Sequence, residues 1–130
     1  MCKVKILNKR MLMMIEKLAR MAMLYDFYGQ LLTKRQQEMM EMFYADDLSL
    51  SEIAQEYGIS RQAVYDLLKR TEKILEGYEA KLCLLNKFEQ QSQKITDIGE
   101  LVSQAKETRN LGLLDRVSEI IQEINELERK

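Results

Sequence analysis

The chain has 130 residues and a formal net charge of −1, because 20 basic side chains almost balance 21 acidic ones. It contains no histidine, so the side chain that most often acts as a general base or a metal ligand is missing. Its two cysteines, Cys2 and Cys83, lie too far apart in the sequence to form a metal-binding or redox motif. We therefore expect neither catalysis nor a metal or other cofactor.

The sequence also lacks a candidate membrane span. Its longest run without a charged residue, Phe27 to Thr33, is far shorter than the ~20 residues that cross a bilayer. The apolar run from Met11 to Ile15 follows a basic N-terminus but is too short for the core of a signal peptide. Because unpatterned cysteines fit a reducing compartment, the sequence predicts a cytoplasmic protein.

Helices are predicted from end to end, beginning with one over residues 15–32. Apolar residues recur there at steps of three and four, which places them on a single helix face. That predicted face consists of Ile15, Leu18, Ala19, Ala22, Tyr25, Tyr28 and Leu32. A second helix is expected after Thr33, which forms a capping-box pattern with Gln36. Its buried side is expected to hold Met39, Met40, Phe43 and Tyr44, before a loop at Asp46 and Asp47.

Residues 49–70 have the spacing of a helix-turn-helix. Ser49 and Glu52 form a second capping box, and Gly58 follows where a short helix must end in a left-handed backbone conformation. Ser60 then caps a third helix. Side chains of suitable size are available where the two helices would cross. These are Ile53, Ala54, Ile59, Val64 and Leu67.

A long amphipathic pattern runs onward from Thr71. Its apolar residues recur mostly at three, four or seven, as in a coiled-coil seam or a hairpin packed against an apolar partner. They are Ile74, Tyr78, Leu82, Leu85, Phe88, Ile95, Ile98 and Val102. Cys83 lies next to this seam and is expected to be buried. A turn is predicted at residues 109–112, before a last helix with Leu114, Val117, Ile121, Ile124 and Leu127 inward.

The predicted fold is therefore all-α, with a helix-turn-helix core followed by long amphipathic C-terminal helices. We expect the helix-turn-helix domain to span residues 13–73 and the C-terminal helical arm to span residues 74–130. Residues 1–12 are interpreted as a non-native leader.

The second helix of the motif would present polar side chains to a groove of nucleic acid. Its first turn begins with an arginine and a glutamine, which pair with guanine and adenine respectively through two hydrogen bonds. Three basic residues further along the helix suit contacts with phosphates. The predicted nucleic-acid-binding residues are Arg61, Gln62, Tyr65, Lys69, Arg70 and Lys73.

Charge is distributed unevenly along the chain. Residues 1–32 hold six basic and two acidic side chains, residues 33–73 six and eight, and residues 74–130 eight and eleven. Affinity for duplex DNA rests largely on neutralised phosphates, so an acidic module with Asp66 on its reading face argues against tight DNA binding. A module that docks a protein instead of a nucleic acid is the alternative, because a fold does not fix a function.

Several motifs resemble those of the YlxM family of small bacterial proteins. They are Met23-Leu24-Tyr25-Asp26-Phe27-Tyr28, Leu31-Leu32-Thr33, Asp46-Asp47-Leu48-Ser49-Leu50-Ser51-Glu52-Ile53-Ala54, Ser60-Arg61-Gln62-Ala63-Val64-Tyr65-Asp66 and Lys69-Arg70-Thr71-Glu72. The resemblance covers about residues 14–88. The core also resembles the fourth region of bacterial sigma factors, a helix-turn-helix that reads promoter DNA.

The resemblance implies a cellular role. Members of the YlxM family are typically encoded beside the signal recognition particle protein and its receptor, which implies an accessory or regulatory factor of that targeting pathway. The particle's protein and RNA are the implied partners. The sigma-like core implies DNA binding, and a sequence-specific transcriptional regulator is the alternative function.

The resemblance also bears on self-assembly and on the start of the chain. The C-terminal helices of the family are associated with self-assembly, so we expect a homodimer joined through the seam at residues 74–102. Family members usually begin near Glu16, which makes Met11, Met13 or Met14 the expected native start.

Overall fold

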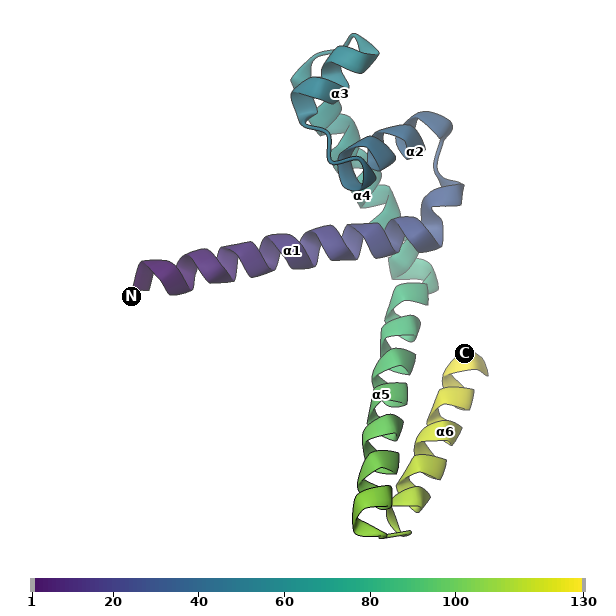
Figure 1. Cartoon of the computed structure of the whole chain (residues 1–130). Coiled ribbons are helices and arrows are strands. Elements are labelled where there is room, and N and C mark those ends of the chain that lie inside the picture. Colours follow the sequence, from purple (N-terminus) through teal and green to yellow (C-terminus); the bar gives the residue numbers. More distant parts are fainter. Residues whose placement is uncertain (1, 130) are drawn as a thin grey trace. The chain divides into compact units, whose positions relative to one another are not determined.

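The computed structural model describes residues 2–129, and of residues 2–8 it describes the backbone alone. Six α-helices, a short 3-10 helix and one π-helical turn make up this part of the chain, which contains no strand (Figure 1). The all-α prediction is confirmed. The elements are α1 (Cys2–Tyr28), η1 (Gly29–Leu31), α2 (Lys34–Met40), η2 (Glu41–Ala45), α3 (Leu50–Tyr57), α4 (Arg61–Leu82), α5 (Leu84–Thr108) and α6 (Leu113–Arg129).

The chain divides into two compact units, and the boundary in the sequence lies between Cys83 and Leu84. The predicted boundary between residues 73 and 74 falls inside α4, because that helix continues to Leu82. The predicted leader, residues 1–12, lies partly outside the described residues, and its described backbone belongs to α1. No helix among the described residues has both the length and the apolar character that a membrane span requires.

The helix starts of the N-terminal unit form as predicted. The Thr33 hydroxyl accepts a hydrogen bond from the backbone N–H of Gln36, and the Gln36 side chain accepts one from the backbone N–H of Thr33. Ser49 and Glu52 form the same reciprocal pair at the start of α3. The Ser60 hydroxyl accepts from the N–H of Ala63 and caps α4. Each cap satisfies backbone donors that a helix start leaves unpaired.

The helix-turn-helix consists of α3, the turn at Gly58, and α4. Gly58 has φ +65°, a left-handed conformation that glycine adopts without strain. Ile53, Ala54 and Val64 are buried between the helices, as the sequence predicts. Asp46 and Asp47 form the loop before α3, and Asp47 also has a positive φ.

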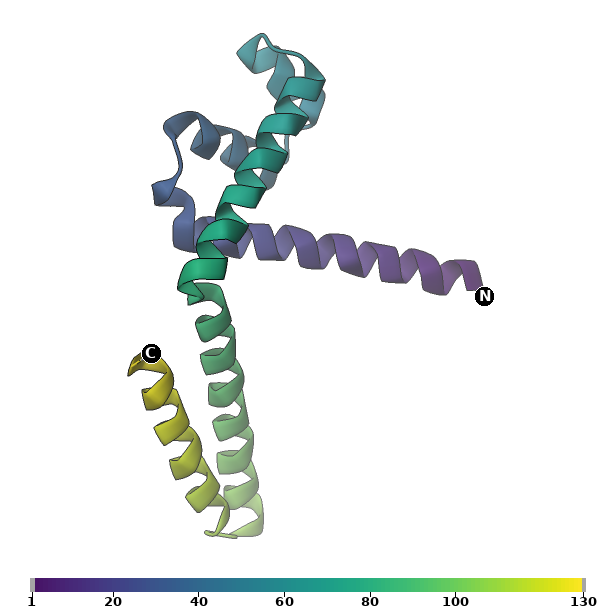
Figure 2. The same ribbon diagram turned by 180° about the vertical axis from the view of Figure 1, so that it is seen from behind.

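Helix α1 packs on α4 through a face that matches the predicted one only in part, since Tyr28, like Leu32 beyond the helix, is buried as predicted. Both views show the two helices crossing (Figures 1 and 2), and the ring of Tyr28 lies 5.9 Å from the ring of Tyr78 on α4. The buried face of α1 consists of Met21, Leu24 and Tyr28. The prediction was wrong for Ile15, Leu18, Ala19 and Ala22, which are exposed. Residues 9–20 are exposed on every side of α1, because this half of the helix extends beyond the rest of the N-terminal unit (Figure 1).

The C-terminal unit is a helical hairpin of α5 and α6, joined by a turn at residues 109–112 as predicted. Lys94 Nζ lies 2.6 Å from Glu123 Oε2, which forms an ion pair between the two helices. Val117 and Ile120 of α6 are buried, whereas Ile121 is exposed, contrary to the prediction. The face of α6 that packs on α5 contains Val117 and Ile120. Ile121 lies next to this face and is therefore exposed.

The break between α4 and α5 occurs at Cys83. Neither glycine of this region interrupts a helix, since Gly77 lies within α4 and Gly99 within α5. Cys83 takes a left-handed conformation with φ 55°. The prediction that its thiol is buried was wrong, because Cys83 occupies the exposed break itself and not the interior of a continuous seam. The predicted seam is therefore divided between two helices.

Candidate nucleic-acid interface

The predicted nucleic-acid-binding residues all lie on the first four turns of α4, the second helix of the helix-turn-helix. Five of the six side chains are exposed, and Lys69 is partly exposed. Buried residues on the opposite side, among them Val64 and Leu68, hold this part of α4 against the rest of the unit. The geometry therefore presents one polar helix face to solvent.

Two exposed side chains of this face, Gln62 and Asp66, are hydrogen-bonded to each other. The Gln62 amide donates a hydrogen bond of 2.9 Å to the carboxylate of Asp66, one turn further along α4. This bond occupies part of the donor capacity with which Gln62 would read an adenine. It also keeps a negative charge in the middle of the face.

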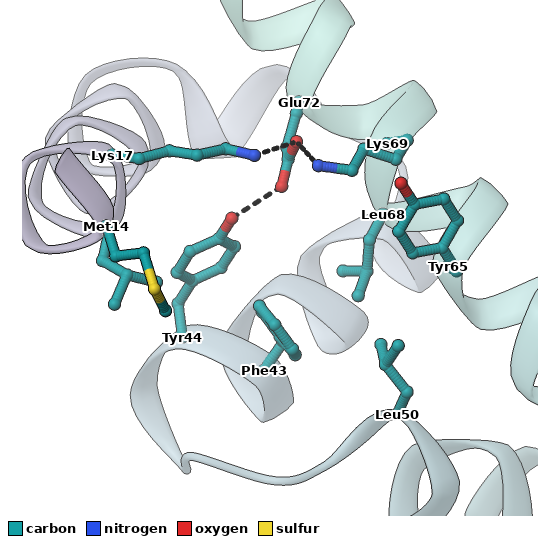
Figure 3. Close-up of a pocket in the computed structure, with 10 residues that line it drawn as sticks. Met14, Lys17, Phe43, Tyr44, Leu50, Tyr65, Leu68, Lys69 and Glu72 are labelled. Atoms are coloured by element: carbon teal, nitrogen blue, oxygen red, sulfur yellow. Dashed lines mark hydrogen bonds and ion pairs between the residues drawn. The ribbon is translucent and has the colours of Figure 1, made fainter. Parts of the chain in front are cut away.

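Lys69 is bound within the unit. Its ammonium lies 3.3 Å from Glu72 Oε2 and 5.5 Å from the centre of the Tyr65 ring. Glu72 also accepts a 2.7 Å hydrogen bond from the Tyr44 hydroxyl, and Lys17 of α1 lies 3.9 Å from it (Figure 3). A phosphate would therefore have to compete with Glu72 for the charge of Lys69.

Arg61, Arg70 and Lys73 remain available. Among the described residues, none of these three side chains has a hydrogen bond or ion pair within the chain, and all three are exposed. Arg61 is the first residue of the helix, while Arg70 and Lys73 lie three residues apart on its third and fourth turns. These are the cations of the face that can contact an anionic ligand without breaking an internal pair.

The first helix of the motif is acidic where it faces solvent. Glu52 and Glu56 are exposed on α3, together with the uncharged Ser51 and Gln55. In helix-turn-helix complexes with duplex DNA the first helix crosses the sugar-phosphate backbone. Two carboxylates at that position repel phosphates, so the geometry is less favourable for this mode of duplex binding than for a ligand that contacts α4 alone.

Comparison with known proteins establishes the family. The family model described as "Putative helix-turn-helix protein, YlxM / p13 like" (UPF0122) matches residues 15–114. The chain belongs to this family. It is 50% identical to the UPF0122 protein YlxM of Bacillus subtilis (strain 168) over 102 residues, which cover 78% of the chain and 93% of that protein.

Other relatives carry the same family name. The chain is 43% identical over 115 residues to UPF0122 proteins of Bacillus cereus (strain AH187) and Bacillus anthracis (strain A0248), a match to 88% of the chain and all of each relative. The family is described by its helix-turn-helix and not by a reaction. The predicted family resemblance is confirmed.

Sequence reasoning missed the cluster around Glu72. This side chain brings together Tyr44 of η2, Lys17 of α1 and Lys69 of its own helix. The spacing of Lys69 and Glu72 on one helix indicates their pairing. No local pattern indicates the other two partners, because they depend on how α1 and η2 pack on α4.

We expect the partly buried tyrosines Tyr44 and Tyr25 to make stability depend on pH in alkaline solution. Burial and the hydrogen bond to Glu72 raise the pKa of Tyr44, and burial together with Glu41 raises the pKa of Tyr25 to about 12. An unfolded tyrosine titrates near pH ~10, so the folded state keeps its protons longer, and stability present below pH ~10 is lost as the pH rises toward 12.

Urea unfolding at increasing pH measures this loss. Tyr44→Phe and Tyr25→Phe should each flatten the decline in the free energy of unfolding above pH ~10. A decline of the same steepness in both variants and in the parent chain would contradict the assignment.

Proposed function

We propose that this protein is an accessory or regulatory factor of the signal recognition particle pathway and acts in the cytoplasm. In this role the exposed face of α4 contacts the particle, through its RNA or its protein. The observation that carries the proposal is the set of available cations at Arg61, Arg70 and Lys73 on a rigidly held helix. The link to this particle in particular rests on the family resemblance.

The charges of the motif favour a ribonucleoprotein partner over a promoter. Glu52 and Glu56 occupy the surface of α3 that would approach duplex phosphates, and Asp66 lies within the reading face of α4. A folded RNA or a protein can meet α4 without lying along α3. The alternative function, a sequence-specific transcriptional regulator, is favoured by the exposure of Arg61 in the first turn of α4, where helix-turn-helix proteins contact bases.

Binding to the particle RNA and to a duplex DNA of equal length, at ~50 and ~200 mM salt, distinguishes these functions. We expect tighter binding to the particle RNA. Arg61→Ala should weaken it by ~1–3 kcal/mol, and the pair Arg70→Ala and Lys73→Ala should lower the salt slope by about 2. Lys106→Ala, which removes an exposed cation from α5, is the control and should change neither quantity.

Each other outcome has a clear meaning. Preference for duplex DNA that depends on Arg61 would support the transcriptional regulator and contradict the accessory role. If neither nucleic acid binds and the isolated particle protein also fails to bind, the accessory role is overturned.

We also propose that the protein is a homodimer joined through the C-terminal hairpin. Ile95 of α5 is 60% exposed, and Leu114 and Ile121 of α6 are 41% and 47% exposed. Leu114 shares the lining of a depression at the end of the hairpin with Val102 of α5. Ile95 and Ile121 lie two turns from Val102 and Leu114 on the same sides of their helices, which places the apolar side chains on a common face. Helices in proteins gain most of their stability from the packing of an apolar face. The hairpin of a second copy, packed on this face, would supply such packing.

A further inference from the structure

The N-terminal unit contains an apolar pocket that shares only Tyr65 and Lys69 with the candidate nucleic-acid interface. It has a volume of about 260 Å³ and lies between α1, η2 and α4 (Figure 3). Its walls are apolar side chains from all three elements and from the start of α3. They include Met14, Leu18, Phe43, Leu50 and Leu68. A pocket of this kind takes a hydrophobic side chain of a partner.

The polar side chains of the pocket carry an excess of positive charge. Two ammonium groups, of Lys17 and Lys69, share the single carboxylate of Glu72, to which Tyr44 also donates. The cluster therefore has one positive charge more than its own carboxylate can balance, and a second carboxylate would complete it.

An exposed apolar stripe on α1 leads away from the pocket. Met11, Ile15 and Leu18 follow one another at steps of four and three, and are 59%, 58% and 46% exposed. Leu18 belongs to both the stripe and the pocket wall. Apolar anchors in this spacing beside a hydrophobic hole match the way in which an amphipathic helix lies in a groove.

Charge selects among the helices that could lie there. Lys17 lies on α1 between Ile15 and Leu18 in the sequence, and Lys17 and Lys69 both line the pocket. A basic helix would bring like charges together at these two side chains, which is unfavourable. An acidic helix meets complementary charge at Lys17 and Lys69.

We propose that the pocket and the α1 stripe bind an acidic amphipathic helix of a partner protein. A leucine or methionine of that helix enters the pocket, and one of its carboxylates pairs with Lys17 and Lys69. This interaction requires no nucleic acid and so goes beyond the function proposed above. Because Tyr65 and Lys69 belong to both surfaces, bound helix and bound nucleic acid would exclude each other.

Two synthetic peptides of 18 residues test the proposal on the full chain. One carries leucines at positions i, i+3, i+4 and i+7 of each repeat and glutamates on its other face; the second has lysine in place of every glutamate. We expect the acidic peptide to bind at least about tenfold more tightly than the basic one, a difference of ~1.4 kcal/mol. Leu18→Glu should abolish binding, and Lys17→Glu should remove the preference for the acidic peptide.

The control is Leu31→Glu, which places the same charge on another exposed leucine of the N-terminal unit, outside the pocket and the stripe, and should leave peptide binding unchanged. Leu18, Lys17 and Leu31 are all substantially exposed, so the variants should fold, as thermal unfolding would verify. Three results would overturn the proposal: no binding of the acidic peptide, equal binding of both peptides, or loss of binding in Leu31→Glu.

Discussion

Replacement of Leu24 with alanine should destabilise the N-terminal unit by about 2–5 kcal/mol. Leu24 has no exposed surface and lies on the face of α1 that packs on α4, between Met21 and Tyr28. The substitution removes buried apolar surface and leaves a cavity, since α1 is also held by two hydrogen bonds of 2.8 Å from Arg20 to Glu76 and cannot easily collapse inward.

Equilibrium unfolding in urea measures the effect. The matched control is Leu31→Ala. It removes the same side-chain atoms as Leu24→Ala, but from a leucine that is 57% exposed to solvent. We expect the control to change the free energy of unfolding by less than ~0.5 kcal/mol. Equal losses in the two variants would show that the stability of the unit does not depend on the packing of α1 on α4.

Replacement of Ile95 with glutamate should dissociate the proposed homodimer. The free energy of burying an unpaired charge in the apolar face destabilises the dimer. It does not affect the monomer, where the side chain remains in water. We expect a loss of at least ~2 kcal/mol, which is about a 30-fold increase in the dissociation constant. Sedimentation equilibrium at micromolar concentration measures it.

Ile15→Glu is the control for this experiment. Ile15 is 58% exposed and Ile95 60%, but Ile15 lies on α1 and not on the hairpin. The parent chain and Ile15→Glu should both sediment as dimers, and Ile95→Glu as a monomer. A parent chain that is monomeric at this concentration would refute the dimer, and a monomeric Ile15→Glu would move the interface to α1.

Local sequence signals predicted much of the helix-turn-helix. Thr33, Ser49 and Ser60 each accept the hydrogen bond that their capping pattern predicts, and Gly58 has the left-handed conformation expected at the turn. These features depend on residues within three or four positions of one another. Such interactions are determined by the local sequence whatever the rest of the fold does.

Features that depend on distant packing could not be predicted in this way. The apolar residues of α1 cover more than one face, and only contact with α4 selects Met21 and Leu24 as the buried ones. Lys69 could be placed on the exposed face from its spacing, but its engagement with Glu72 depends in part on Tyr44 and Lys17, which come from other elements. Helix α4 ends just before Cys83, which has a left-handed backbone conformation. The sequence has no glycine at this position that would indicate such a conformation.

In the proposed function, the exposed face of α4 is the surface that contacts the signal recognition particle. Titration of the ¹⁵N-labelled full chain with the particle RNA, followed by amide chemical shifts, tests this proposal. We predict that the largest shift changes lie within residues 61–73 and disappear in the variant that combines Arg61→Ala, Arg70→Ala and Lys73→Ala. Shift changes confined to α5 and α6, or unaltered in that variant, would contradict the claim.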